Sequence, residues 1–94
     1  MRYALIIGFI TYGKSTAKYL PYFLPSLKKQ TFNNFKIIAF DNTENSDNEN
    51  INYIKNNHPE LEILRAGENI GFARAYNRMI NKAVEMNAEY FLAI

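Results

Sequence analysis

The residues from Gly8 to Ser15 match a pattern that binds phosphate. They read Gly-Phe-Ile-Thr-Tyr-Gly-Lys-Ser, which fits the spacing of a P-loop: two glycines, then a lysine and a hydroxyl residue. In a P-loop the backbone N–H groups of small residues surround the phosphates, whereas residues 9–12 here are bulky and partly β-branched. A P-loop NTPase therefore stays open as an alternative that the loop interior does not favour.

Acidic and amide side chains that can bind a ligand gather between residues 41 and 50. Asp41 and Asp47 are the two aspartates of the chain, and Asn42 follows the first of them directly. A carboxylate accepts a hydrogen bond from the imide N–H of uracil or thymine, but it also caps turns and helices. The residues alone leave both roles open for Asp41. Asn42 and Asp47 are expected either to contact a ribose or to order the loop.

A second group of polar residues follows a predicted turn at residues 69–71, which opens a helix where backbone N–H groups favour an anion. Four polar side chains then lie on one helix face, at Arg74, Asn77, Arg78 and Asn81. Guanidinium groups near a helix start bind a diphosphate bidentately. The spacing thus predicts a diphosphate site, with a solvated helix face as the alternative.

Composition excludes several other kinds of chemistry. The 94 residues contain no cysteine and one histidine, His58, which rules out disulfides, thiolate catalysis and Cys-rich or His-rich metal sites. The net charge is +2 and the basic residues are scattered, so duplex nucleic acid is not an expected partner. The first ten residues lack a signal-peptide pattern and are too short to span a bilayer. We expect a cytoplasmic protein of one domain.

Apolar segments that read as strands alternate with amphipathic segments that read as helices. Strands are expected at residues 3–10, 35–40, 61–64 and 90–94, with the first buried on both faces and the third near the sheet edge. The first helix should be capped by Ser15 or Thr16 and kinked or delayed by Pro25, and a turn is expected at residues 30–34. The second helix should end at His58, and the third should run from Phe72 to residue 85 with Phe72 on its apolar stripe. The alternation predicts an α/β, three-layer Rossmann-like parallel sheet of about four strands with three helices.

Four pieces of sequence, in this order and at these intervals, resemble the N-terminal, nucleotide-sugar-binding half of a family 2 glycosyltransferase. They are residues 10–12, residues 26–31, residues 37–42 with Ser46 and Asp47 just beyond, and residues 69–77. The resemblance covers almost the whole chain. Asp41-Asn42 and the Gly71-Phe72-Ala73 helix start are similar to the rhamnosyltransferase-like branch, which acts on cell-surface polysaccharides. The resemblance implies a GT-A type fold, with residues 1–94 forming a single, truncated, partial domain.

The resemblance also implies a site and its partners. In this family the end of the first strand and the aspartate that ends the second form the base pocket, to which Thr11, Tyr12 and Asp41 correspond. Together with Asn42, and with Gly71, Arg74 and Asn77 of the predicted diphosphate site, they form the expected nucleotide-binding set. Arg78 departs from the small residue often found there. The implied donor is a UDP-sugar or dTDP-sugar, and the implied acceptor is a saccharide. The family holds a divalent metal, Mg or Mn, through an Asp-x-Asp motif after the fourth strand, so neither metal ligands nor a catalytic residue are expected in this chain, which is expected to be inactive alone.

Two further expectations concern surfaces. The fourth strand should form a sheet edge with exposed apolar side chains, through which the chain self-associates. A non-enzymatic dimeric interaction domain is the third functional hypothesis. His58 is expected to be an exposed residue at a helix end, and Tyr19, Tyr22, Phe23, Phe32 and Phe35 are expected to fill the interface between helix and sheet.

Overall fold

The structure, a computed structural model, describes residues 4–29 and 34–94. Within these residues the chain forms eight elements, in the order β1 (Leu5–Thr11), α1 (Gly13–Ala17), α2 (Leu20–Lys28), β2 (Phe35–Asp41), α3 (Glu49–Asn57), β3 (Glu62–Arg65), α4 (Gly71–Glu85) and β4 (Tyr90–Ala93). The expected start of the first strand at Tyr3 and most of the turn at residues 30–34 lie outside the described residues. The remaining expected strands and helices are present, with bounds that shift by a few residues.

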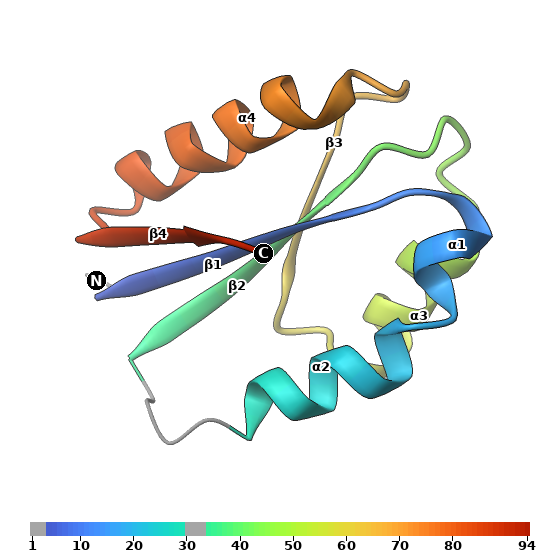
Figure 1. Cartoon of the computed structure of the whole chain (residues 1–94), viewed down its shortest axis with the longest axis horizontal. Coiled ribbons are helices and arrows are strands. Elements are labelled where there is room, and N and C mark those ends of the chain that lie inside the picture. The colour runs from blue at the N-terminus through green and yellow to red at the C-terminus, as the bar shows by residue number, and fades with distance from the viewer. Residues whose placement is uncertain (1–3, 30–33) are drawn as a thin grey trace.

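The described strands form one parallel sheet in the order β3-β2-β1-β4 (Figure 1). β1 is central, as its continuous apolar run predicts, because a strand buried on both faces needs no polar alternation. β4 pairs with β1 and β3 lies at the opposite edge, which confirms both expected positions. The fold is therefore the α/β Rossmann-like sheet that the sequence predicts, with one more short helix than expected.

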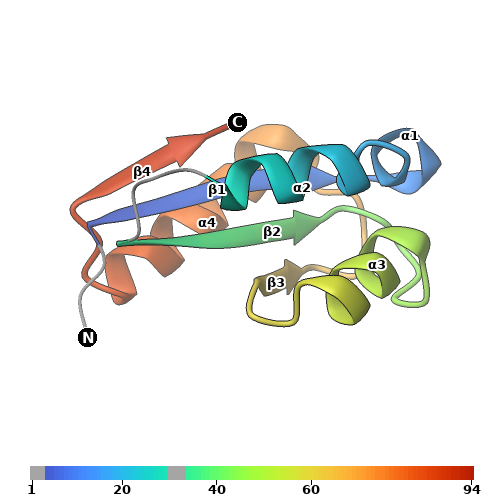
Figure 2. The ribbon, with the colours of Figure 1, turned by 90° about the horizontal axis from the view of Figure 1, so that it is seen from below.

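Helices cover the two faces of the sheet (Figure 2). The side chains between helices and sheet form two hydrophobic cores. Alternate residues of β1 and β2 point to opposite faces. On one face, α2 and α3 cover Phe9, Ile37 and Ala39. On the other, α4 covers Ile6, Ile38 and Phe40 through Ala75, Met79 and Ala83, which recur every four residues along the helix. Three layers result, and both cores stop at the carboxyl ends of the strands.

The expected first helix is in fact two helices. α1 begins at Gly13, whose φ of +59° suits glycine, and Ser15 and Thr16 lie inside α1 instead of capping it. The Thr16 hydroxyl instead accepts a hydrogen bond from the backbone N–H of Tyr12 at 2.9 Å. α2 then starts at Leu20 and continues through Pro25. The capping prediction was therefore wrong, although the Thr16 hydroxyl still stabilises the beginning of α1.

His58 is buried, with 7% of its surface exposed, so the prediction of an exposed helix end was wrong. Its Nδ1 lies 3.2 Å from the Lys28 ammonium nitrogen, and the same ammonium group donates to the Glu60 carboxylate at 3.0 Å. The Tyr53 ring packs beside the imidazole. Burial lowers the pKa of His58, and the positive charge of Lys28 lowers it further, against a smaller opposing effect of Glu60. The histidine thus joins the C-terminal ends of α2 and α3.

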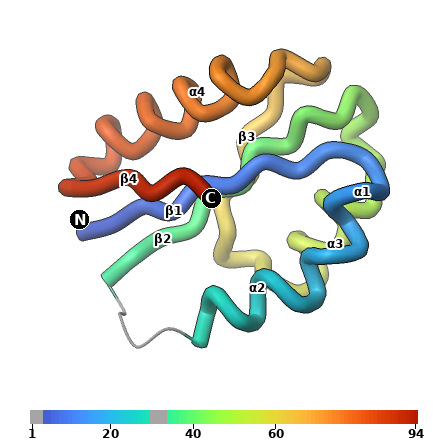
Figure 3. Tube along the Cα trace, in the orientation of Figure 1, coloured from blue at the N-terminus to red at the C-terminus, as the bar shows by residue number. Residues whose placement is uncertain are grey.

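Several aromatic side chains remain at the surface. Phe23 and Phe35 pack against the core on the α2 side as expected, whereas Tyr19 and Tyr22 are exposed and Phe32 lies outside the described residues. β4 lies beside β1 at the edge of the sheet (Figure 3). Its Tyr90 and Leu92 are exposed, as is the adjoining Ile94. Among the described residues, no helix has the length and apolarity needed to cross a membrane.

Candidate functional site at the carboxyl ends of the strands

Three neighbouring strands place polar side chains in one row where the apolar core ends. Thr11, Asp41 and Arg65 are the last residues of β1, β2 and β3, and they occupy matching positions in the parallel register. The Thr11 hydroxyl donates to Asp41 Oδ1 at 2.8 Å, and Arg65 Nε lies 3.4 Å from Asp41 Oδ2. The row therefore links the ends of the three strands through the Asp41 carboxylate.

Two more donors complete the surroundings of this carboxylate. The Thr43 hydroxyl donates to Oδ1 at 2.9 Å and the Asn48 amide donates to Oδ2 at 2.9 Å. Asp41 is 1% exposed. An ionised carboxylate offers about four lone-pair positions, and the four donors match that number. Asp41 is thus a buried carboxylate whose hydrogen bonds join the carboxyl ends of the strands to the loop after β2.

Arg65 is a site residue that the sequence analysis did not single out. Besides contacting Asp41, its Nη2 donates to the backbone carbonyls of Thr43 at 2.7 Å and Glu44 at 3.1 Å. The guanidinium group therefore binds both the carboxylate and the loop after β2. Its sequence signal was its place at the end of a predicted strand, which is the same signal that drew attention to Asp41.

Asn42 joins the end of β2 to the beginning of α4. Its Oδ1 accepts from the Ile70 N–H at 3.3 Å and its amide donates to the Gly71 carbonyl at 3.4 Å. Gly71 has a φ of +81°, and its own N–H donates to the Asn69 side chain at 2.9 Å. Two backbone N–H groups at this helix start are therefore already bonded to side chains of the chain itself.

A pocket of about 420 Å³ lies between the end of β1 and the beginning of α4. Its lining residues come from both segments and from the end of β2: Ile10, Tyr12, Ser15, Thr16, Asn42, Asn69, Gly71 and Phe72. Two aromatic side chains contribute to it, Tyr12 at 41% exposed and Phe72 at 72% exposed. Phe72 was expected on the buried stripe of the helix, but that stripe instead begins at Ala75. The pocket unites Tyr12, Asn42 and Gly71 from the predicted set and adds Phe72.

The other predicted residues lie outside this lining. Thr11 and Asp41 are buried beside it, as the partners of each other. Arg74 and Asn77 lie on the exposed face of α4, as do Arg78 and Asn81. The predicted set thus falls into three groups: two buried residues, Thr11 and Asp41; three pocket residues, Tyr12, Asn42 and Gly71; and two exposed residues of α4, Arg74 and Asn77.

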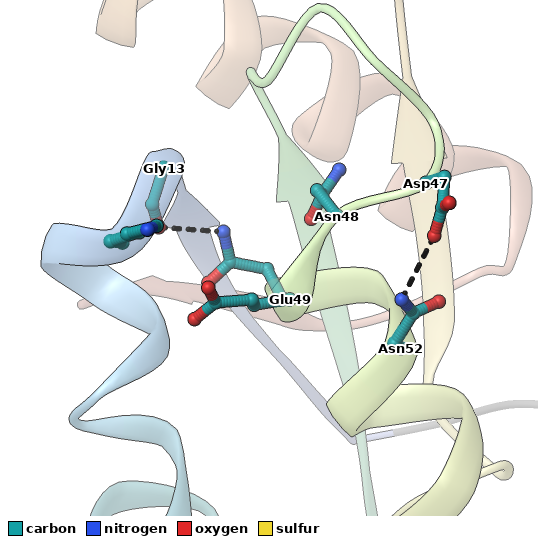
Figure 4. Close-up of a pocket in the computed structure, with 7 residues that line it drawn as sticks. Gly13, Asp47, Asn48, Glu49 and Asn52 are labelled. Carbon is teal, nitrogen blue, oxygen red and sulfur yellow. Dashed lines mark hydrogen bonds between the residues drawn. The ribbon is translucent and has the colours of Figure 1, made fainter.

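A second, polar pocket of about 380 Å³ lies on the other side of α1, against the start of α3 (Figure 4). It is lined by Gly13, Lys14, Asp47, Asn48, Glu49, Asn50 and Asn52. The Asn50 amide donates to the Gly13 carbonyl at 2.9 Å, and the Asn52 amide donates to Asp47 at 3.1 Å. The first contact joins α1 to α3, and the second joins α3 to the loop that precedes it.

The residues of the P-loop pattern do not form a phosphate-binding loop. Gly8 to Thr11 lie inside β1, in register with β2, and the first glycine has β4 on its other side. A Cβ atom at Gly8 would come within 2.6 Å of the Phe91 ring, so this glycine is needed for close packing and not for a phosphate. Lys14 is exposed on α1. The P-loop alternative is therefore not favoured.

The described residues contain no group of three His, Cys, Asp or Glu side chains that could hold a metal ion. Asp41, the one buried aspartate, already binds four protein donors. The side chains of residues 4–29 and 34–94 therefore do not fit the divalent metal that the resemblance implies.

Comparison with known proteins agrees with the fold. The profile of the family described as glycosyl transferase family 2 matches residues 6–90, which extend from the second residue of β1 to the first residue of β4. None of the curated proteins compared with the chain matches it. Because the match extends over most of the sequence, from the central strand through the helix that bounds the pocket, the chain belongs to the family 2 glycosyltransferases.

Proposed function

We propose that the pocket beside Tyr12 and Phe72 binds the nucleoside of a nucleotide-sugar donor, of the UDP or dTDP type. The observation that carries the proposal is the pair of exposed aromatic side chains on one pocket at the carboxyl ends of parallel strands. Ligands of open α/β sheets bind outside these strand ends. A volume of about 420 Å³ falls toward the lower end of the range of roughly 300–1,000 Å³ for small-molecule sites, and suits a nucleoside.

Each residue of the predicted set has a distinct part in this proposal. The Tyr12 ring covers the base, and Asn42 and Gly71 form the wall toward α4. Thr11 and Asp41 lie beneath the pocket and support its wall. Since four donors already occupy Asp41, an imide N–H that reached its carboxylate would replace one of them, and the longest of these contacts is that of Arg65 at 3.4 Å.

The diphosphate is assigned to the outer face of α4. Arg74 and Asn77 lie one and two turns into the helix, on its exposed side. An exposed guanidinium binds a phosphate pair with a strong dependence on salt. The donor carries a hexose or rhamnose for a saccharide acceptor of cell-surface polysaccharide, as the resemblance to the rhamnosyltransferase-like branch suggests.

The pocket is tested by titrating UDP, dTDP and ADP into the wild-type chain and two pairs of variants. Tyr12→Ala and Phe72→Ala remove the pocket aromatics, and Tyr22→Ala and Val84→Ala remove exposed apolar side chains of α2 and α4 away from it. Loss of a base-stacking ring costs about 1–3 kcal/mol, so we expect UDP to bind at least about fivefold more weakly to the pocket variants and unchanged to the controls.

Calorimetry gives the affinities, and the melting temperature checks that each variant is folded. Tighter binding of UDP or dTDP than of ADP supports a pyrimidine donor. Binding of ATP with magnesium that disappears in Lys14→Ala would instead favour the P-loop alternative. No binding of any nucleotide would reject the proposed site.

We also propose that β4 pairs with a second copy of the chain. Tyr90 and Leu92 of β4 are exposed, as is the adjoining Ile94. One edge of β4 pairs with β1, and the other edge is the end of the described sheet. Such an edge offers backbone donors and acceptors together with apolar surface. Sedimentation at micromolar concentration should show dimers that Leu92→Lys dissociates, whereas a monomeric wild-type chain would contradict this assembly.

A further inference from the structure

A series of hydrogen bonds connects Arg65 to the pocket wall across three segments of the chain. Arg65 donates to the Thr43 carbonyl at 2.7 Å and contacts Asp41, which accepts from the Thr43 hydroxyl. The same hydroxyl oxygen accepts from the Gly13 N–H at 3.1 Å. Gly13 follows Tyr12 directly, so Thr43 is held by Arg65 on one side and holds the pocket segment on the other.

The position of Tyr12 depends on backbone contacts at both of its ends. Its N–H donates to Thr16 and its carbonyl accepts from Ser15, both within α1. Thr43 and Asn50 hold the next residue, Gly13, to the rest of the molecule. Because Asn50 supports Gly13 independently of Arg65, losing the arginine should loosen this segment without detaching it.

The chemistry of arginine fits this place better than that of lysine. The side chain is 23% exposed, and its Nε and Nη2 address three oxygen atoms, on Asp41, Thr43 and Glu44. A planar guanidinium can donate to several acceptors in a fixed arrangement, whereas an ammonium group acts as a point charge. Arg65 therefore fixes the direction of the Thr43 carbonyl as well as neutralising Asp41.

We propose that Arg65 is a positioning residue for the donor pocket. Acting through Thr43 and Gly13, it fixes Tyr12 and thereby raises the affinity of the pocket for the nucleoside. This assignment rests on the proposed function of the pocket. It makes Arg65 a determinant of donor binding although the side chain does not line the pocket.

The test is a double-mutant cycle on the affinity for UDP. Arg65→Gln should weaken UDP about fivefold when Tyr12 is present and less than twofold in the Tyr12→Ala background, because the arginine acts through that ring. Arg65→Lys should lie between wild type and Arg65→Gln. Lys82→Gln is the matched control, since it removes a half-buried cation that pairs with Glu62 at the other end of β3.

Thr43 provides a second route to the same answer. Thr43→Val keeps the shape but removes the hydroxyl, and should weaken UDP like Arg65→Gln, while Thr43→Ser should restore wild-type affinity. Equal losses from Arg65→Gln with and without Tyr12 would overturn the proposal. So would a Thr43→Ser variant that binds as weakly as Thr43→Val.

Hydrogen exchange of the Gly13 amide separates this proposal from the proposed function. Exchange should become at least about fivefold faster in Arg65→Gln and Thr43→Val, and stay unchanged in Lys82→Gln, whether or not a nucleotide is present. If the wild-type chain binds no nucleotide, the donor pocket fails as a function while faster Gly13 exchange still supports the positioning of this segment. Unchanged Gly13 exchange in both variants would overturn the role of Arg65.

Discussion

Two polar clusters of the molecule contain a carboxylate and a basic side chain, yet they differ in what surrounds them. At the carboxyl ends of the strands, Asp41 is buried and all its acceptor positions are used by protein donors. Between the C-terminal ends of α2 and α3, the Lys28 and Glu60 side chains are 39% and 56% exposed beside the buried imidazole of His58. The first cluster is a rigid base for a pocket, and the second is a contact between helices.

The difference lies in how completely each buried group is satisfied. Within the described part of the chain, the imidazole accepts from Lys28 at Nδ1 while its buried Nε2 has no hydrogen-bond partner. An unsatisfied buried donor is costly, and a protonated ring would face the Lys28 ammonium group. A fall in pH that protonates His58 should therefore weaken the helix-end cluster.

The largest effect should come from removing the central carboxylate. Asp41→Ala leaves four donors without their acceptor, one of them the charged Arg65, and breaking a buried ion pair in this way costs about 3–5 kcal/mol. Glu60→Ala is the matched change in the other cluster and should cost at most about 1 kcal/mol, because its pair is solvent-exposed. Urea denaturation measures both.

If the Asp41→Ala chain does not fold, Asp41→Asn keeps the shape and two of the acceptor positions and should still lose more stability than Glu60→Ala. Equal losses for the two clusters would contradict the contrast drawn between them.

A smaller effect is expected from pH. Because the pKa of His58 is lowered in the folded chain, the unfolded chain takes up the proton first as pH falls below about 6.5. The free energy of unfolding should thus be constant above about pH 7 and decrease below it, by at most about 1.4 kcal/mol per pH unit for one proton. His58→Gln should remove this part of the slope, as the difference between two denaturation series shows. A wild-type slope that His58→Gln leaves unchanged would mean that His58 titrates alike in both states.

The fold could be predicted closely because its signals are local. The uninterrupted apolar run of β1 and the shorter, less apolar β3 indicated which strand is central and which lies near an edge. The start of α1 at Gly13 was missed because it depends on the φ of +59° at Gly13 and on the hydrogen bond that the Tyr12 N–H donates to the Thr16 hydroxyl. Neither feature changes the spacing of apolar residues, from which the helices were predicted.

The site could be predicted only in part. Tyr12, Asn42 and Gly71 were found through their places at strand ends and a helix start, and they line one pocket. The partners of Asp41 come from four separate positions, and Arg65 lies 24 residues away in sequence. Phe72 was expected to be buried because the spacing of apolar residues places it on the apolar stripe of the helix. In the structure the buried residues of α4 begin one turn later, at Ala75. Such long-range contacts leave no spacing signal.

The most direct test of the account is to titrate UDP into the isotopically labelled chain and follow the backbone amide resonances. We expect shifts at the strand-end site, at Tyr12, Asn69 and Phe72, and no shift at His58 or Leu61 between the helix ends. Tyr12→Ala should strongly reduce the shifts, and Tyr22→Ala should not. Shifts centred on His58 and Leu61, or no shift at any residue at millimolar UDP, would contradict the assignment of the donor pocket.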